Sequence, residues 1–364
     1  MSHDVYVLIP GITGSVLEKD GRDVFGLTAE AGLRALFSAG RSIDALRLVD
    51  DPWEVDDIGD GVRATRLAAD AHLVPGLWKI DGYGAVGQYL RRRLRLVPGE
   101  SYFEFPYDWR RDNRVAARRL ASSARRWLAA RRATYPDAQL VLVAHSMGGL
   151  VARYYLEALD GWRDTRTLIT FGTPYRGSLN AVGFLAIGYT KMFGLIDLTD
   201  LMRSFTSVHQ LLPIYPCLDR GDGTLVRLTE AAGLVPGLDP VKVAAARRFH
   251  AEIEDAVGRH GDDDDYRTNG YRVCPVVGIE QPTDQSAVWS GDRLTVLRTY
   301  EGADFGGDGT VPRVAAFPQE ADNEWNALFA PARHASLQNT DAVLTQVRGW
   351  MTSVDLKKFR AGAP

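Results

Sequence analysis

Short apolar runs alternate with segments of helical periodicity along this chain. The apolar runs are rich in Val, Ile and Leu, as in strands buried on both faces of a sheet, and the segments between them carry one apolar and one polar face. This alternation is typical of an α/β protein with a mostly parallel central sheet flanked by helices. Strands are predicted at residues 5–9, 101–108, 139–144, 167–172 and 273–281. Helices are predicted at residues 84–94, 113–135 and 341–351, and a hairpin at 287–300.

Two long segments interrupt this alternation. Residues 20–70 form a lid-like excursion that contains a helical pattern at 28–40. Residues 176–270 lack alternating strands and hold helical, loop and acidic stretches, which is typical of an inserted cap. We therefore predict a core whose first part covers residues 1–175, an inserted cap at 176–270, and a second core part at 271–364.

One stretch combines the two patterns within a few residues. An apolar strand runs directly into a helical sequence at residues 141–159, with Ser146 at the sharp turn between them. Such a turn strains the serine backbone and requires small residues two positions away on each side, where Ala144 and Gly148 stand. It also holds the serine hydroxyl out of the sheet, next to the positive end of the helix. Ser146 is therefore the candidate nucleophile, provided that a base elsewhere takes its proton.

The base and its partner follow in the order that this strand–turn–helix scaffold uses, which is serine, acid, histidine. A Gly-rich turn at residues 305–312 presents Asp308, and a loop before the last helix presents His334. We predict that His334 Nε2 accepts the Ser146 proton and that Asp308 accepts a hydrogen bond from His334 Nδ1–H. Asp304 is the alternative acid. His145 precedes the serine on the strand side, so its side chain is expected to point away from the hydroxyl and to pack under the turn.

An oxyanion formed at Ser146 needs two main-chain donors. The first strand ends at Pro10-Gly11, and a glycine turn there can direct N–H groups at the nucleophile. We predict that the donors are the N–H groups of Met147, which follows the nucleophile, and of Ile12, with Thr13 as the alternative.

Several pieces of the chain, in this order and over nearly its full length, resemble the lecithin:cholesterol acyltransferase and lysosomal phospholipase A2 family of α/β-hydrolases. They are IPGITGS (9–15), LVPGLWKIDGYGAVGQYL (73–90), FPYDWR (105–110), AHSMGG (144–149), FGTPYRGS (171–178), GDGTVP (307–312) and RHASL (333–337). FPYDWR and the pair GDGTVP and RHASL are the specific ones. The resemblance implies an α/β-hydrolase fold, a serine acyl-enzyme and an acyl-ester substrate, often a phospholipid. It assigns the catalytic roles to Ser146, Asp308 and His334 and the oxyanion donors to Ile12 and Met147.

The cysteine content departs from the secreted and lysosomal members, in which a disulfide closes a lid loop. The chain has two cysteines, Cys217 and Cys274, and neither lies in the corresponding 20–75 segment. The lid disulfide is therefore expected to be absent, as in a bacterial-type member. Few cysteines, and a first predicted strand that begins almost at the first residue, favour a cytoplasmic enzyme.

Charge and motif content restrict the other function classes. The net charge is −3, which suggests no nucleic-acid partner. The histidines and cysteines have no metal-ligand spacing, so neither a metal nor a cofactor is expected.

The predicted cap contains the most apolar part of the chain. Residues 181–215 are apolar on more than one helical face, and such a segment must be covered by protein, substrate or membrane. We predict that it binds the acyl chain, although packing within the cap is an equal alternative, and that lid and cap make transient contact with a membrane surface. The candidate acyl-binding residues are Phe184, Tyr189, Met192 and Phe193.

Taken together, the sequence predicts a serine-dependent acyl-ester hydrolase or acyltransferase that acts on a lipid-like ester. One alternative is a thioesterase or tailoring acyltransferase with a carrier-bound acyl donor. An alternative of another class is a binding module that keeps the fold without turnover. The oligomeric state, the acyl donor and the acceptor stay open at this stage.

Overall fold

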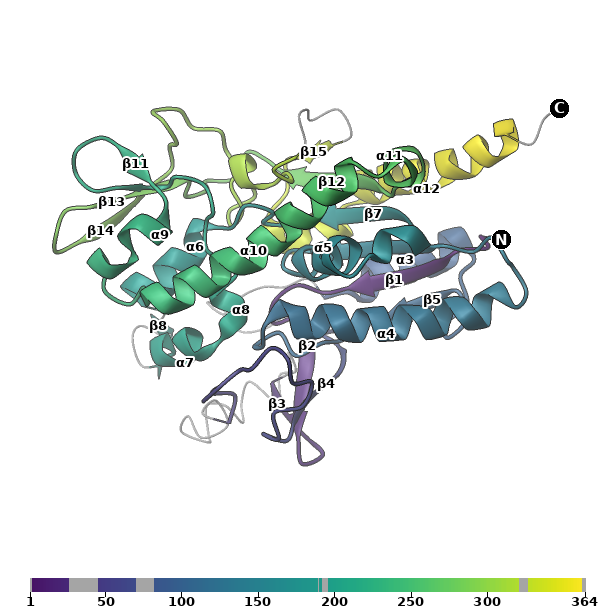
Figure 1. Cartoon of the computed structure of the whole chain (residues 1–364), viewed down its shortest axis with the longest axis horizontal. Coiled ribbons are helices and arrows are strands. Elements are labelled where there is room, and N and C mark those ends of the chain that lie inside the picture. The colour runs from purple at the N-terminus through teal and green to yellow at the C-terminus, as the bar shows by residue number, and fades with distance from the viewer. Residues whose placement is uncertain are drawn as a thin grey trace.

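The computed structural model describes residues 2–25, 45–69, 82–188, 190–191, 196–320 and 327–361 (Figure 1). The helix expected at 28–40 therefore lies outside the described residues. Among the helices that are described, none is both long and apolar enough to cross a bilayer.

A six-stranded sheet in the order β15-β12-β7-β6-β1-β5 forms the centre of the molecule, and all its neighbouring strands pair in parallel. The β-branched and aliphatic runs of the sequence form its middle, where every residue of β1 and β6 is buried. The predicted α/β fold is confirmed. The six strands are β1 (Val5–Ile9), β5 (Tyr102–Glu104), β6 (Leu140–His145), β7 (Thr165–Phe171), β12 (Arg272–Gly278) and β15 (Leu328–Ala330).

Helices cover both faces of this sheet (Figure 1). Alternate residues of β1 point to opposite faces, and they belong to two separate apolar clusters. One cluster joins the sheet to α4 (Asn113–Arg132), α5 (Gly148–Ala158) and α10 (Pro240–Gly261). The other joins it to α3 (Gly84–Leu94) and α12 (Asp341–Ala361).

Helix α4 shows how the sequence specifies these elements. The Asp112 side chain caps its first turn by accepting the N–H of Arg114. Its buried residues Ala117, Leu120, Ala124 and Leu128 recur every three or four positions, which places them on one face against the sheet.

The described residues between β7 and β12 contribute no strand to the six-stranded sheet. They form helices, with short two-residue strands that sequence periodicity is too coarse to detect. The apolar cluster under α4 and α5 continues into this segment through Phe205, Leu228 and Phe249. The cap boundaries at 176 and 270 stay predictions. The elements of this segment are α6 (Leu179–Val182), η2 (Gly183–Ile187), β8 (Thr190–Lys191), β9 (Ile196–Asp197), α7 (Thr199–Ser204), α8 (Thr206–His209), β10 (Leu218–Asp219), β11 (Leu225–Val226), α9 (Leu228–Ala231), η3 (Ala232–Leu234), α10 and α11 (Asp264–Asn269).

The described residues also form three smaller sheets, of four, three and two strands. The predicted hairpin is present as β13 (Ser286–Trp289) paired antiparallel with β14 (Leu294–Leu297). A three-stranded antiparallel sheet, which the sequence pattern does not predict, lies partly within the predicted lid-like excursion at 20–70 and partly just before it. It consists of β2 (Ser15–Lys19), β3 (Arg22–Phe25) and β4 (Val62–Leu67). The remaining short elements are η1 (Gly161–Asp164), η4 (Arg313–Ala315) and η5 (His334–Asn339).

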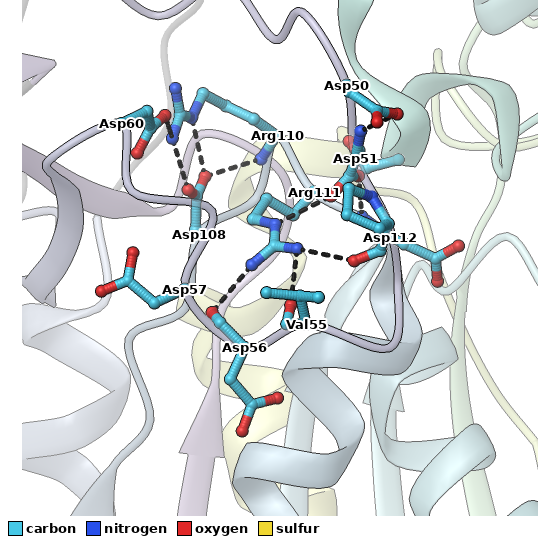
Figure 2. A network of polar contacts seen from close by, with 12 residues as sticks. Asp50, Asp51, Val55, Asp56, Asp57, Asp60, Asp108, Arg110, Arg111 and Asp112 are labelled. Carbon is cyan, nitrogen blue, oxygen red and sulfur yellow. Dashed lines mark hydrogen bonds and ion pairs between the residues drawn. The ribbon is translucent and has the colours of Figure 1, made fainter.

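Two adjacent arginines after β5 fix the loop of residues 46–60 to the core (Figure 2). The Arg110 side chain is fully buried. It donates two hydrogen bonds to the Asp108 carboxylate at 2.9 and 2.6 Å and one to Asp60 at 2.8 Å. It also donates to the carbonyl of Leu46 at 3.0 Å.

Arg111 holds the middle of the same loop. Its Nε donates to Asp51 at 2.8 Å, and its two terminal nitrogens donate to the carbonyls of Pro52, Val55 and Asp56 (Figure 2). A guanidinium has five donors in a fixed plane, so a single side chain can fix a whole turn of backbone. Asp108 and Arg110 of the FPYDWR motif, together with the adjacent Arg111, thus place loop 46–60.

Candidate active site

The turn between β6 and α5 has the strained geometry that the sequence predicts. Ser146 adopts a left-handed backbone with φ of +51°, which is uncommon for a residue with a side chain. Its N–H donates to the Phe171 carbonyl at 2.9 Å. Helix α5 begins against the end of β1, where a Cβ at position 148 would lie 2.3 Å from the Pro10 carbonyl oxygen. Only glycine fits at Gly148.

Three side chains from distant parts of the chain meet at this turn. His334 Nε2 lies 2.9 Å from Ser146 Oγ, and His334 Nδ1 lies 2.7 Å from Asp308 Oδ2. Because an ionised carboxylate only accepts hydrogen bonds, Nδ1 carries the proton and Nε2 is free to accept the serine hydroxyl. The structure therefore brings together Ser146, Asp308 and His334, the residues predicted to form the catalytic triad.

Local contacts fix the Asp308 carboxylate. Its Oδ1 accepts the N–H groups of Thr310 at 2.9 Å and Val311 at 2.7 Å, which leaves Oδ2 for His334. Gly172 provides the space, since a Cβ there would lie 2.7 Å from Asp308 Oδ2 and 2.9 Å from His334 Nδ1. The alternative acid, Asp304, is not bonded to His334.

Asp304 has a different set of partners. Its Oδ1 accepts hydrogen bonds from Gln285 Nε2 at 2.6 Å and from the Gly306 N–H at 2.8 Å. These contacts stabilise the turn that leads to Asp308. The geometry therefore favours Asp308 over Asp304 as the partner of His334.

The candidate oxyanion donors lie beside the serine. A Cβ on Gly11 would be 2.8 Å from Ser146 Cβ, so the loop after β1 packs directly on the turn. Within the described part of the chain, the N–H groups of Ile12 and Met147 donate to no protein acceptor. Met147 precedes the first residue of α5, where N–H groups lack partners inside the helix. Thr13, the alternative donor, has a φ of +61°.

His145 does not bond to the serine hydroxyl, and its exposed fraction is 4%. Its Nδ1 lies 2.9 Å from the Tyr83 hydroxyl, and its Nε2 lies 3.1 Å from the main-chain carbonyl of His334. Burial, helped by the neighbouring His334, lowers the pKa of His145 to about 3. The sequence analysis expected a packed histidine here but did not identify either partner, which are 62 and 189 residues away.

A cavity of about 820 Å³ opens beside Ser146 and His334. This volume is within the usual range for small-molecule sites. Phe184, one of the predicted acyl-binding residues, lines it; Tyr189, Met192 and Phe193 lie outside the described residues. The other apolar side chains in its wall include Ile12, Leu179, Ile187, Met202, Val208, Leu211, Val296 and Val311. Most of these apolar residues come from the predicted cap.

Few ionisable side chains share this wall. Besides Asp308, His145 and His334, they are Asp284 and Arg333. Burial raises the pKa of Asp284, and the nearby Arg298 opposes this shift. Neither Asp284 nor Arg333 is a predicted site residue, although Arg333 begins the RHASL motif, because isolated charged residues in loops give no periodic signal.

Residues 94–232 match the family model described as lecithin:cholesterol acyltransferase. The chain is also 27% identical over 243 residues to the lysosomal phospholipase A and acyltransferase of Homo sapiens. Over these residues the chain is similar to the lecithin:cholesterol acyltransferase family. The alignment covers 58% of this chain and 57% of the human protein, so it spans little more than half of that relative.

A solved structure is similar in fold to nearly the whole of this chain. A chain of the Tle4–Tli4 complex superposes with a TM-score of 0.59 at 15% identity, and the superposition covers 94% of this chain and 96% of that one. At this identity the likeness concerns the fold alone. Together with the parallel sheet and the strained serine turn, it establishes an α/β-hydrolase fold.

The family match does not reach every part of the site. Ser146 and Phe184 lie within the matched residues 94–232, whereas Ile12, Asp308 and His334 lie outside them. The placement of these three residues therefore depends on the geometry described above.

The two cysteines of the chain do not pair with each other. Cys217 and Cys274 are both free and buried. Burial raises the pKa of each thiol to about 12, so neither is a ready nucleophile.

Proposed function

We propose that this protein is a serine-dependent acyl-ester hydrolase or acyltransferase that acts on a lipid-like substrate. Ser146 is the nucleophile, His334 the general base, and Asp308 the residue that orients His334. The main support is the continuous hydrogen-bonded series from Asp308 Oδ2 through His334 to Ser146 Oγ, with distances of 2.7 and 2.9 Å. The relationship to an acyltransferase family supports the same reaction class.

The geometry supports a two-step mechanism. His334 Nε2 takes the Ser146 proton as Oγ attacks the ester carbonyl carbon, and the N–H groups of Ile12 and Met147 stabilise the resulting oxyanion. The tetrahedral intermediate collapses, the C–O bond to the alcohol breaks, and His334 returns its proton to that alcohol. Water or an acceptor alcohol then attacks the acyl carbonyl and gives its proton to His334. The bond to Ser146 Oγ breaks, and His334 returns the proton to Ser146 Oγ.

The cavity supports a lipid-like acyl group. Its wall beside Ser146 is mainly aliphatic and aromatic, and burying each methylene of a chain contributes about 0.8 kcal/mol. Phe184 and Ile187 in this wall come from the α6–η2 segment of the predicted cap. We infer that this segment contacts the acyl chain.

Two further parts of the proposal concern the surroundings of the enzyme. Ile187 lines the cavity and is 60% exposed, so an apolar side chain stands at the cavity mouth. Trp53 and Val55 are exposed on loop 46–60, and together these residues support transient contact with a membrane surface. The cytoplasmic location is supported by the free thiols of Cys217 and Cys274.

A serine-reactive fluorophosphonate probe tests the nucleophile. We expect the wild-type protein to be labelled at one site and the Ser146→Ala variant to lose that label completely. Ser122→Ala is the matched control, because Ser122 is exposed on α4 and should not affect labelling. A folded wild-type protein that takes up no probe, or a Ser146→Ala variant that keeps the label, would contradict the proposal and favour a binding module.

A mass-spectrometric screen then identifies the acyl donor. Phospholipids, acyl thioesters and neutral esters are each supplied with and without an added alcohol. We expect release of fatty acid from an oxygen ester, with an acylated alcohol as a second product if transfer occurs. Turnover of thioesters alone would replace this proposal with the carrier-dependent thioesterase or acyltransferase.

A further inference from the structure

Two buried side chains connect the two loops that the proposed reaction needs on either side of Ser146. The first loop, after β1, carries the candidate oxyanion donor Ile12. The second loop carries His334. Tyr83 and His145 lie between them, and their exposed fractions are 2% and 4%.

The hydrogen bonds form one uninterrupted series. The Gly11 N–H donates to the Tyr83 hydroxyl oxygen at 2.8 Å. The Tyr83 hydroxyl lies 2.9 Å from His145 Nδ1, and His145 Nε2 lies 3.1 Å from the His334 carbonyl oxygen. The series thus begins one residue before Ile12 and ends on the backbone of the proposed general base.

The donors and acceptors allow a single arrangement of protons. The Gly11 N–H occupies an acceptor position of the Tyr83 oxygen, and the His334 carbonyl can only accept. His145 Nε2 must therefore carry a proton, and its Nδ1 must accept the Tyr83 hydroxyl proton. His145 is then the neutral Nε2–H tautomer, and it remains so because burial disfavours its charged form.

The neutral state of His145 matters because the ring of His334 lies beside it. The His145 and His334 ring centroids are 5.0 Å apart. His334 becomes positively charged when it takes the serine proton, and a second cation at that distance would oppose the proton transfer. A neutral His145 can hold the His334 backbone without this penalty.

The His334 backbone is held from two sides. Its N–H donates to the Asp308 carbonyl at 2.9 Å, and its carbonyl accepts from His145. The short helix η5, which begins at His334, is also bonded to the residue before Tyr83. The Asn339 side chain at its end donates to the Gly82 carbonyl at 3.1 Å. The position of His334 relative to the loop after β1 is therefore set through Tyr83 and His145.

We propose that Tyr83 and His145 are positioning residues, which align the oxyanion loop and His334 on Ser146 by fixing His145 as the Nε2–H tautomer. This inference rests on the proposed function. Neither residue takes a proton from the substrate. Their effect is to hold the nucleophile, the base and the oxyanion donors in a geometry where a displacement of 1 Å costs about 100-fold in rate.

The first test is the Tyr83→Phe variant. It removes one hydroxyl from a residue that does not line the cavity, and it leaves His145 Nδ1 without a donor. We expect kcat on a p-nitrophenyl ester to fall by about tenfold or more with KM changed by less than about twofold. Tyr215→Phe is the control, because it also removes a buried hydroxyl, which donates to the Gln285 carbonyl at 2.9 Å.

The His145 side chain itself is tested by two replacements. In His145→Gln the amide nitrogen can still donate to the His334 carbonyl, whereas in His145→Leu it cannot. We expect the Gln variant to keep at least about ten times the kcat of the Leu variant. Equal kcat values in these two variants, or a Tyr83→Phe loss no larger than that of Tyr215→Phe, would overturn the proposal.

A measurement independent of turnover separates this inference from the proposed function. Histidine-selective ¹⁵N NMR on the wild-type protein, with His145→Gln for assignment, reports the tautomer. We expect an Nε2–H signal for His145 that is unchanged from pH 5 to 8, and a mixture of tautomers in Tyr83→Phe. An Nδ1–H tautomer in the wild type, or a His145 that titrates in this range, would overturn the proposal even if Ser146 were labelled by the probe.

Discussion

Ser146 shows at the scale of one residue how strain is stored at the site. A left-handed backbone at a residue with a side chain costs of the order of 1–3 kcal/mol and persists only where neighbours enforce it. Here the Ser146 N–H bonds to the Phe171 carbonyl, and Gly148 allows α5 to begin against Pro10. The strained turn lifts the hydroxyl to His334 Nε2, 2.9 Å away.

Asp308 and Asp304 give a prediction at the same scale, because they stand four residues apart and have different partners. Asp308→Asn keeps the size of the side chain but can no longer fix the His334 tautomer, and we expect kcat to fall by about 10³–10⁴-fold. Asp304→Asn, which affects only the turn, should change kcat by less than about tenfold. Steady-state kinetics on a soluble ester decide between them. A larger loss of kcat in Asp304→Asn than in Asp308→Asn would assign the orientation of His334 to Asp304 instead.

At the scale of elements, the sequence predicts the parts whose periodicity is long or strong. The strand at β1, the unit from β6 to α5, helices α3 and α4, and the hairpin β13–β14 are all present. The strands β2, β3 and β4 were missed because they are short and mix charged with apolar residues, so no alternation stands out. Their order also depends on pairing partners distant in sequence.

The candidate site also contains some features that the sequence predicts and others that it does not. The strand–turn–helix pattern and the fixed order of residues predict the meeting of Ser146, Asp308 and His334 without coordinates. Tyr83 and His145 were not connected with each other, because a hydrogen bond between residues 62 positions apart leaves no periodic trace. Loop residues of the cavity wall such as Asp284 and Arg333 become visible only once the fold brings them together.

Loop 46–60 gives a prediction at this scale. Arg111 is 96% buried, and Arg111→Ala would remove its hydrogen bonds to the Asp51 carboxylate and to three carbonyls, so we expect a loss of about 3 kcal/mol in the free energy of unfolding. Arg118→Ala is the matched control, because Arg118 also contacts Asp56 but through an exposed ion pair of about 1 kcal/mol or less. Chemical denaturation measures both values. Losses of equal size would show that the Arg111 contacts do not hold this loop.

At the scale of the whole molecule, buried histidines join separate parts of the fold. His250 is part of α10, and its Nε2 lies 2.8 Å from the carbonyl oxygen of Gln210, the residue that follows α8. The Gln210 side chain in turn accepts the N–H of Asn113, the first residue of α4. One buried imidazole thereby connects α10 and the end of α8, both in the predicted cap, to the start of α4. Burial lowers its pKa to about 4, and that of His209 to about 4.

These shifts predict how stability depends on pH. The unfolded chain takes up a proton at each histidine near pH 6.5, whereas the folded protein keeps His250 neutral down to about pH 4. The stabilisation is therefore complete above pH 6.5 and is lost as the pH falls toward 4, by about 2 kcal/mol for one such group at pH 5. His250→Gln can still bond to Gln210 but does not titrate. Its free energy of unfolding should thus fall by about 2 kcal/mol less than that of the wild type between pH 7 and 5.

Urea denaturation followed by circular dichroism at several pH values measures this difference. His3→Gln is the control, because the His3 side chain is 50% exposed and lies outside the buried network. Its pH dependence should match that of the wild type. If the wild type and His250→Gln lose the same free energy between pH 7 and 5, His250 is protonated in the folded state, and the junction of α10, α8 and α4 must then accommodate a buried charge.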